Sequence, residues 1–208
     1  MGLECRRGLE EDGAMQSYRL ILASSSPRRR ELLADAGVEF EVLEPPLAEP
    51  ATGLMGLDPA AQAEASAYFK ARAVGLREDA YVLGADTIVA AGEAVLGKPA
   101  DAEDARAMLS SLSGTRHTVI TGVALLGPGG RRRIASAMTV VVMRTLTPAE
   151  VAEYVASGEW EGKAGGYAIQ ETADRFVARV EGSFSNIVGL PMELVRRLIE
   201  EMRGEERQ

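Results

Sequence analysis

The chain alternates between short apolar runs and longer stretches in which apolar residues recur with a helical period. Short apolar runs between turn residues are typical of buried strands, and they predict strands at 19–23, 40–43, 81–83, 118–126, 134–143 and 176–180. Capping residues and helical spacing predict helices over 27–36, 58–74, 101–112, 147–157 and 191–202. Strands and helices that interleave in this way are typical of an α/β domain.

Glycines and prolines predict where the chain turns. We expect a turn at 84–87, an extended stretch at 88–91, a hairpin at 92–93 and a second hairpin at 127–130. No composition shift divides the chain, so one domain over 18–203 is expected, with an N-terminal extension at 1–17 and a short tail at 204–208.

The overall charge is acidic, with 23 Lys and Arg against 31 Asp and Glu and a net charge of −8. An acidic chain lacks the attraction to phosphate backbones and anionic lipids that nucleic-acid and membrane binders use. We therefore expect neither nucleic acid nor a membrane as partner. Any phosphate site must be a local cluster of cations.

Cysteine and histidine limit the metal chemistry, because the chain has one of each, Cys5 and His117. An intrachain disulfide and a zinc finger are both excluded. A bound metal would need carboxylate ligands, which favours Mg²⁺ or Mn²⁺. Without a second histidine or a nearby cysteine, His117 is interpreted as structural or solvated.

The first candidate motif is the serine and arginine run from Ser24 to Arg30, which lies between a predicted strand and a predicted helix. Backbone N–H groups at a helix N-terminus attract anions, and arginines add charge-assisted hydrogen bonds. The run therefore fits a triphosphate cradle. The alternative is a capped helix with a solvated basic turn.

The second motif places Asp86 in Gly-Ala-Asp-Thr after an apolar strand. Ligands of α/β sheets gather at the carboxyl ends of strands, where an aspartate can accept a proton from water or hold a divalent ion. Taken alone, an ordinary Asp-Thr turn is the simpler interpretation.

A third motif, Gly92 to Lys98, matches the spacing Gly-x4-Gly-Lys of a phosphate-binding P-loop. Such a loop needs Ser or Thr after the lysine, followed by a helix. Pro99 stands there instead, so we reject the P-loop but keep Lys98 as a candidate phosphate cation.

Two glycine-containing segments complete the set. In 163–170 the paired glycines would let the backbone approach a flat ligand while Gln170 reads its edges. The segment 182–191 is interpreted mainly as an entry to the last helix. Glu49 and Lys70 carry no signal by themselves.

Taken together and in this order, the motifs resemble the Maf family of nucleoside triphosphate pyrophosphatases. The resemblance spans about 19–202 and rests on LASSSPRRRELL, Glu49, Lys70, VLGADTIV, GEAVLGKP, SGTRHTVITGVAL, KAGGYAIQ and GSFSNIVGLP. It implies an α/β fold with an elongated mixed sheet, flanking helices and a central cleft, like that of inosine triphosphate pyrophosphatases.

The resemblance also implies the reaction, in which water attacks the α-phosphorus of a nucleoside triphosphate and pyrophosphate leaves. Asp86 would be the catalytic proton acceptor, and Glu49 and Asp86 would hold a divalent cation, Mg²⁺ or Mn²⁺. The phosphates would be bound by Ser24, Arg28, Arg29, Lys70 and Lys98. The family further implies a cytoplasmic homodimer and a role in septum inhibition.

Base choice is implied by Arg28, Thr87 and Gln170, which look like the branch that acts on dTTP and UTP. Glu171 stands where the family usually has glycine, and it affects the expected substrate ranking. Two alternatives stay open: a purine pyrophosphatase acting on ITP or XTP, and a nucleotide-binding regulator of cell division that does not turn over.

Overall fold

The protein, described by a computed structural model over residues 19–46, 56–169 and 172–206, is built on one mixed seven-stranded sheet. The strands are hydrogen-bonded in the order β2-β1-β3-β5-β6-β7, and β4 pairs with β3. Their bounds are β1 Arg19–Ala23, β2 Glu41–Val42, β3 Ala80–Ala91, β4 Ala94–Leu96, β5 Arg116–Leu126, β6 Arg132–Met143 and β7 Val177–Glu181.

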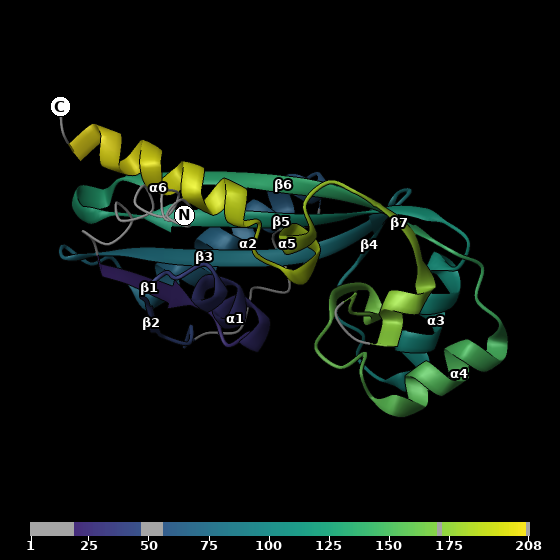
Figure 1. Ribbon diagram of the computed structural model, residues 1–208. Helices are drawn as coiled ribbons and strands as arrows, with labels where there is room; N and C mark the ends of the chain where they lie inside the picture. The colour runs from purple at the N-terminus through teal and green to yellow at the C-terminus, as the bar shows by residue number, and fades with distance from the viewer. Residues whose placement is uncertain (1–18, 47–55, 170–171, 207–208) are drawn as a thin grey trace, which may run out of the picture.

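Six α-helices flank this sheet within the described residues. They are α1 Pro27–Asp35, α2 Pro59–Val74, α3 Ala102–Leu112, α4 Pro148–Ser157, α5 Phe184–Val188 and α6 Met192–Glu206. Figure 1 shows an elongated molecule, with α1, α2 and α6 around one end of the long strands and α3 and α4 at the other end. No helix in the described ranges is long and apolar enough to cross a membrane.

Alternate residues of β3 point to opposite faces of the sheet, as strand geometry requires. Tyr81, Leu83 and Ala85 pack in the core that lies under α6. Val82 packs on the other face with Ala67 and Ala71 of α2. The two helices therefore cover opposite faces of the same strand.

Helix α2 lies unusually close to the sheet, because two glycines stand beneath it. A Cβ atom added to Gly84 would lie 2.3 Å from the carbonyl oxygen of Ala67. At Gly122 it would lie 2.2 Å from the carbonyl carbon of Ala63. Neither strand could carry a side chain there without displacing the helix backbone.

Most of the predicted elements are confirmed. Asp58, Asp101 and Thr147 are N-caps of α2, α3 and α4, and Thr147 forms the expected capping box with Glu150. The fold class is also confirmed as α/β, with an elongated mixed sheet and flanking helices. The strand expected at 40–43 is limited to Glu41–Val42, and 182–191 contains the short helix α5.

The turn expected at 84–87 is wrong. β3 runs without interruption from Ala80 to Ala91 and pairs with β5 along this stretch, where Asp86 lies opposite Gly122. Gly84 marks the close approach of α2 and not a change of chain direction, because a glycine inside a strand can serve either purpose.

Candidate active site

The site lies where β3 has no neighbouring strand on one edge. β1 pairs with β3 only from Ala80 to Gly84, and β4 pairs only from Val89 to Ala91. Asp86 lies between these two stretches. Within the part of the chain that the structure describes, no strand pairs with this edge of β3 there. The gap opens a cleft there, beyond the carboxyl end of β1 rather than that of β3.

Two adjoining cavities make up this cleft, and we call them the inner and the outer cavity. They share the side chains of Ser26, Arg28, Arg29, Lys70, Lys98 and Lys163. Only the inner cavity reaches Asp86 and Thr87, and only the outer one reaches Ser24 and Ser25. The first, second and third sequence motifs therefore meet at one place.

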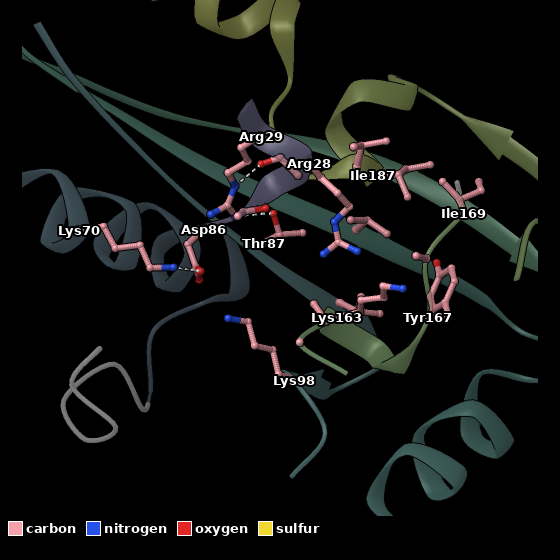
Figure 2. A pocket seen from close by; sticks show the side chains of 18 residues that line it. Arg28, Arg29, Lys70, Asp86, Thr87, Lys98, Lys163, Tyr167, Ile169 and Ile187 are labelled. Atoms are coloured by element: carbon pink, nitrogen blue, oxygen red, sulfur yellow. Dashed lines mark hydrogen bonds and ion pairs between the residues drawn. The ribbon is translucent and has the colours of Figure 1, made fainter. Parts of the chain in front are cut away.

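Lys70 and Asp86 form an ion pair at the wall of the inner cavity, with 2.5 Å between Nζ and Oδ1. Their side chains are 11% and 12% exposed. The pair depends on the close packing of α2 over Gly84 and Gly122, since that packing brings the helix to the strand. Lys70 thus orients the carboxylate that faces the cleft (Figure 2).

Arg29 is buried, and its guanidinium donates to three oxygens of the protein. Nε lies 2.8 Å from the carbonyl oxygen of Gly189, Nη1 3.3 Å from Ser24 Oγ and Nη2 3.2 Å from Thr87 Oγ1. The side chain therefore connects the start of α1 with β3 and with the end of α5. Arg29 thus holds three walls of the cleft together, and its expected contact with phosphate stays a prediction.

Thr87 belongs to a chain of hydroxyl hydrogen bonds. Thr121 donates to the carbonyl oxygen of Asn186 at 3.0 Å, and its oxygen lies 2.9 Å from that of Thr87. Because each hydroxyl has one hydrogen, Thr87 must donate to Thr121. With an N–H of Arg29 already directed at it, the Thr87 oxygen can only accept a further hydrogen bond from a ligand.

Arg28 and Lys98 have no ion pair or side-chain hydrogen bond to the rest of the described structure, and both line the inner and the outer cavity. Figure 2 shows the guanidinium of Arg28 in the middle of the cavity, with Lys98 on the opposite wall. The P-loop is excluded by geometry as well, because Gly92 lies in the β3–β4 hairpin and no helix follows Lys98 directly.

Lys163 is a cationic wall residue that the sequence interpretation missed. It is 8% exposed and lines both cavities. The paired glycines that follow it predict a close approach of the backbone to a ligand and carry no signal for the lysine side chain. Its signal was its place at the head of that motif, directly before Ala164–Gly166, a 3-10 turn.

Part of the wall of the inner cavity is apolar, and we call this part the apolar end. It is lined by Val89, Val119, Tyr167, Ala168, Ile169, Ile187 and Val188. Figure 2 shows Lys70 and Asp86 on one side of the cavity and Tyr167 and Ile169 on the other. A ligand with an anionic end and a flat, mostly apolar end fits this polarity.

His117 is buried behind that apolar end, at 2% exposure, with Nε2 2.7 Å from the Tyr167 hydroxyl. Burial lowers the pKa of His117 to about 4, so the imidazole is neutral at pH 7. Burial also raises the pKa of the Tyr167 phenol. Of the two expectations for His117, a structural role agrees with this burial and hydrogen bond, whereas a solvated side chain does not.

Two predicted site residues, Glu49 and Gln170, lie outside the described residues, as does Glu171. Among the described residues, no group of three or more His, Cys, Asp or Glu could hold a metal ion. Asp86 is the carboxylate of the inner cavity, and Glu31 and Glu161 line the outer one. This donor set fits Mg²⁺, which is commonly held by one or two carboxylates together with substrate phosphates and water.

Comparison with known proteins agrees with the motifs. The chain is 47% identical to a dTTP/UTP pyrophosphatase of Pelotomaculum thermopropionicum, over 83% of this chain and 91% of that protein. It is 48% identical to a dTTP/UTP pyrophosphatase of Sphingopyxis alaskensis, over 86% and 94%. A solved HAM1 protein from Coxiella burnetii aligns with a TM-score of 0.46 at 16% identity, over 88% of this chain and 99% of that one, which is too distant to bear on function.

A family model described as Maf-like protein matches residues 19–202. This range runs from the first residue of β1 into α6 and includes every described residue of the cleft. On the match of the family model and the identity to these relatives, the chain belongs to the Maf family.

Proposed function

We propose that the protein is a nucleoside triphosphate pyrophosphatase that hydrolyses dTTP and UTP to the monophosphate and pyrophosphate. The observation that carries the proposal is the position of Asp86, which lines a cavity whose wall has both cationic and apolar side chains, on the side opposite Tyr167 and Ile169. The names of relatives at 47% and 48% identity support the same substrates.

The triphosphate would lie along Arg28, Lys98 and Lys163, which together offer three cationic side chains to one stretch of cleft. Cations that face the leaving pyrophosphate stabilise the charge that builds on the bridging oxygen. Ser24, Ser25 and Ser26 line the outer cavity beside the N-terminus of α1, where backbone N–H groups favour anions. The N–H of Ser26 is not among these groups, because it donates to Ser24 Oγ at 3.1 Å. The nucleoside would extend into the apolar end.

Asp86 would accept the proton of the water that attacks the α-phosphorus. Its carboxylate faces the cavity, and the contact from Lys70 holds one oxygen in place. A placed base of this kind contributes about 10²–10⁴-fold to the rate. Lys70 is thereby proposed as a positioning residue, in addition to its expected contact with phosphate.

A divalent cation, Mg²⁺ or Mn²⁺, would be held by Asp86 and Glu49 together with the substrate phosphates. When bound, it would neutralise phosphate charge and polarise the bond that breaks. The proposal rests on the oxygen donor of the inner cavity and on the family resemblance.

Base choice is proposed to depend on Arg28, Thr87 and Gln170. Thr87 can offer a ligand only an acceptor, because its hydrogen is committed to Thr121. Uracil and thymine carry an N3–H donor, whereas N3 of cytosine is an acceptor. If Thr87 accepts from this N3–H, CTP should be a poor substrate, because the donor of cytosine is the 4-amino group at a different position on the ring. Hypoxanthine also carries a ring N–H, so a substrate panel must include ITP.

The family resemblance is also the ground for proposing a homodimer that works in the cytoplasm. Light scattering of the purified chain tests the dimer, and localisation of a tagged chain in cells tests the compartment. A role in septum formation would be tested by cell length on overexpression of the wild type and of Asp86→Asn.

The test of function is a panel of dTTP, UTP, CTP, ITP and 7-methyl-GTP with Mg²⁺ or Mn²⁺, scored for pyrophosphate and for orthophosphate. We expect pyrophosphate from dTTP and UTP, and its loss in Asp86→Asn. Preference for ITP would overturn the base assignment and keep the chemistry. Nucleotide binding without turnover would favour a regulatory protein.

A further inference from the structure

The buried His117–Tyr167 pair stands directly behind the apolar end of the inner cavity. The two rings meet edge to face, with 5.6 Å between centroids and 85° between planes, and the hydroxyl and Nε2 are 2.7 Å apart. Tyr167 is 5% exposed and lines the cavity, whereas His117 does not reach it. The ring that lines the cavity is therefore tied at its hydroxyl by a residue that the ligand never contacts.

The two partners sit on very different parts of the fold. His117 is the second residue of β5 and is paired in the sheet with Val141. Tyr167 follows an irregular turn, in which Gly165 and Gly166 both have positive φ. A side chain on such a segment needs a partner on a rigid element to hold its orientation. The histidine on β5 supplies that partner.

The backbone before Tyr167 is closely packed, which limits where the ring can lie. A Cβ atom at Gly165 would lie 2.9 Å from Cγ2 of Val89. Val89 is itself a residue of the apolar end. The segment thus presses against β3 on one side, and the tyrosine ring reaches back to β5 through its hydroxyl.

We propose that His117 is a positioning residue for the nucleoside: it holds the Tyr167 hydroxyl so that the ring forms a fixed wall against the flat base. This inference rests on the proposed function, since it assigns the base to the apolar end. Aromatic side chains recognise flat ligands through ring contacts whose strength depends on orientation. The histidine therefore acts on the base and not on the phosphates.

The test compares a ligand that has the nucleoside with one that lacks it, and each variant is referred to the wild type with the same ligand. One is α,β-methylene-UTP, which cannot be cleaved between the α- and β-phosphates. The other is inorganic triphosphate, which has no nucleoside. Their dissociation constants are measured by calorimetry with Mg²⁺ for the wild type, Tyr167→Phe, His117→Leu and His117→Gln. Tyr154→Phe is the matched control, since it removes a buried hydroxyl from the same core without lining the cavity.

We expect Tyr167→Phe and His117→Leu to weaken α,β-methylene-UTP about tenfold and to leave inorganic triphosphate within about twofold of wild type. His117→Gln should recover part of the loss, because its side-chain amide can reach the hydroxyl. Equal weakening of both ligands, or no weakening of either, would overturn the inference. Should His117→Leu fail to fold, Tyr167→Phe tests the same bond from the other side.

Failure of the proposed function gives a different result. If the wild type neither binds α,β-methylene-UTP nor releases pyrophosphate from any nucleotide, then the function itself is wrong and the inference falls with it. Suppose instead that the wild type binds and cleaves UTP, while the His117 and Tyr167 variants change the two dissociation constants no more than Tyr154→Phe does. In that case only the role of His117 is wrong.

Discussion

Lys70 Nζ and Asp86 Oδ1 lie 2.5 Å apart, and this contact joins helix α2 to the strand that carries the proposed base. Lys70→Met should lower kcat by about 10-fold or more, because the carboxylate loses the group that orients it. The free energy of unfolding should fall by about 1–3 kcal/mol, since an ion remains without its partner at a site that is nearly buried. Steady-state kinetics and denaturant unfolding measure the two effects. A Lys70→Met variant with wild-type kcat would contradict the positioning role.

Gly122→Ala should disturb that same pair by displacing α2, the helix that carries Lys70. A Cβ at Gly122 would lie 2.2 Å from the backbone of Ala63, so α2 must shift outwards. We expect a loss of about 3 kcal/mol in unfolding free energy, at the upper end of overpacking costs, together with reduced turnover. Gly204→Ala is the control, since its Cβ meets nothing within 4 Å. Equal stability of the two variants would refute the close-packing argument.

Neighbouring arginines should respond differently to the same substitution. Arg29→Lys loses buried hydrogen bonds to Gly189, Ser24 and Thr87, so the melting temperature should fall, with a cost of about 1.5–3 kcal/mol. Arg28→Lys should leave the melting temperature unchanged and raise KM for UTP about tenfold, because this guanidinium faces the cavity. Thermal scans and kinetics of both variants decide the matter. The assignment fails if Arg28→Lys is the destabilised variant.

Stability should depend on pH through His117. Its pKa is lowered by burial to about 4, against about 6.5 in an unfolded chain, so the unfolded state binds the proton more readily. The contribution of the neutral His117 side chain to the free energy of unfolding is full above pH 6.5 and is lost progressively as the pH falls towards 4. Over that range we expect His117 to account for about 1–3 kcal/mol.

Urea unfolding of the wild type and of His117→Gln between pH 4 and pH 7.5 measures this contribution. The carboxylates titrate in both proteins, so the difference between the two isolates the histidine. That difference should shift in favour of the variant as the pH falls. A difference that is constant with pH would show that the pKa of His117 is the same in the folded and unfolded states, which would contradict the prediction.

The sequence predicted most elements of the fold because their signals are local. Asp101 and Thr147 each cap the helix that follows them, and such caps depend on neighbouring residues only. Asp86 was expected at the end of a strand because Gly84 resembles a turn residue. The reason for that glycine is α2, whose approach is a tertiary contact that a local pattern does not contain.

The candidate site was predicted in part for the same reason. Arg28, Lys98 and Asp86 do face one cleft, as the motifs suggested. The use of Arg29 to join three walls depends on Gly189, which is 160 residues away, and so no local spacing could reveal it. Lys163 was missed because a lysine before two glycines has no pattern that separates a cavity wall from a solvated loop.

Hydrolysis of dTTP in ¹⁸O-labelled water, with Mg²⁺ and mass analysis of both products, shows which phosphorus the water attacks. Water that attacks the α-phosphorus beside Asp86 should leave the label in dTMP, release unlabelled pyrophosphate, and give neither product with Asp86→Asn. Release of orthophosphate, or label in the pyrophosphate, would contradict the account, because the attack would then fall on a different phosphorus.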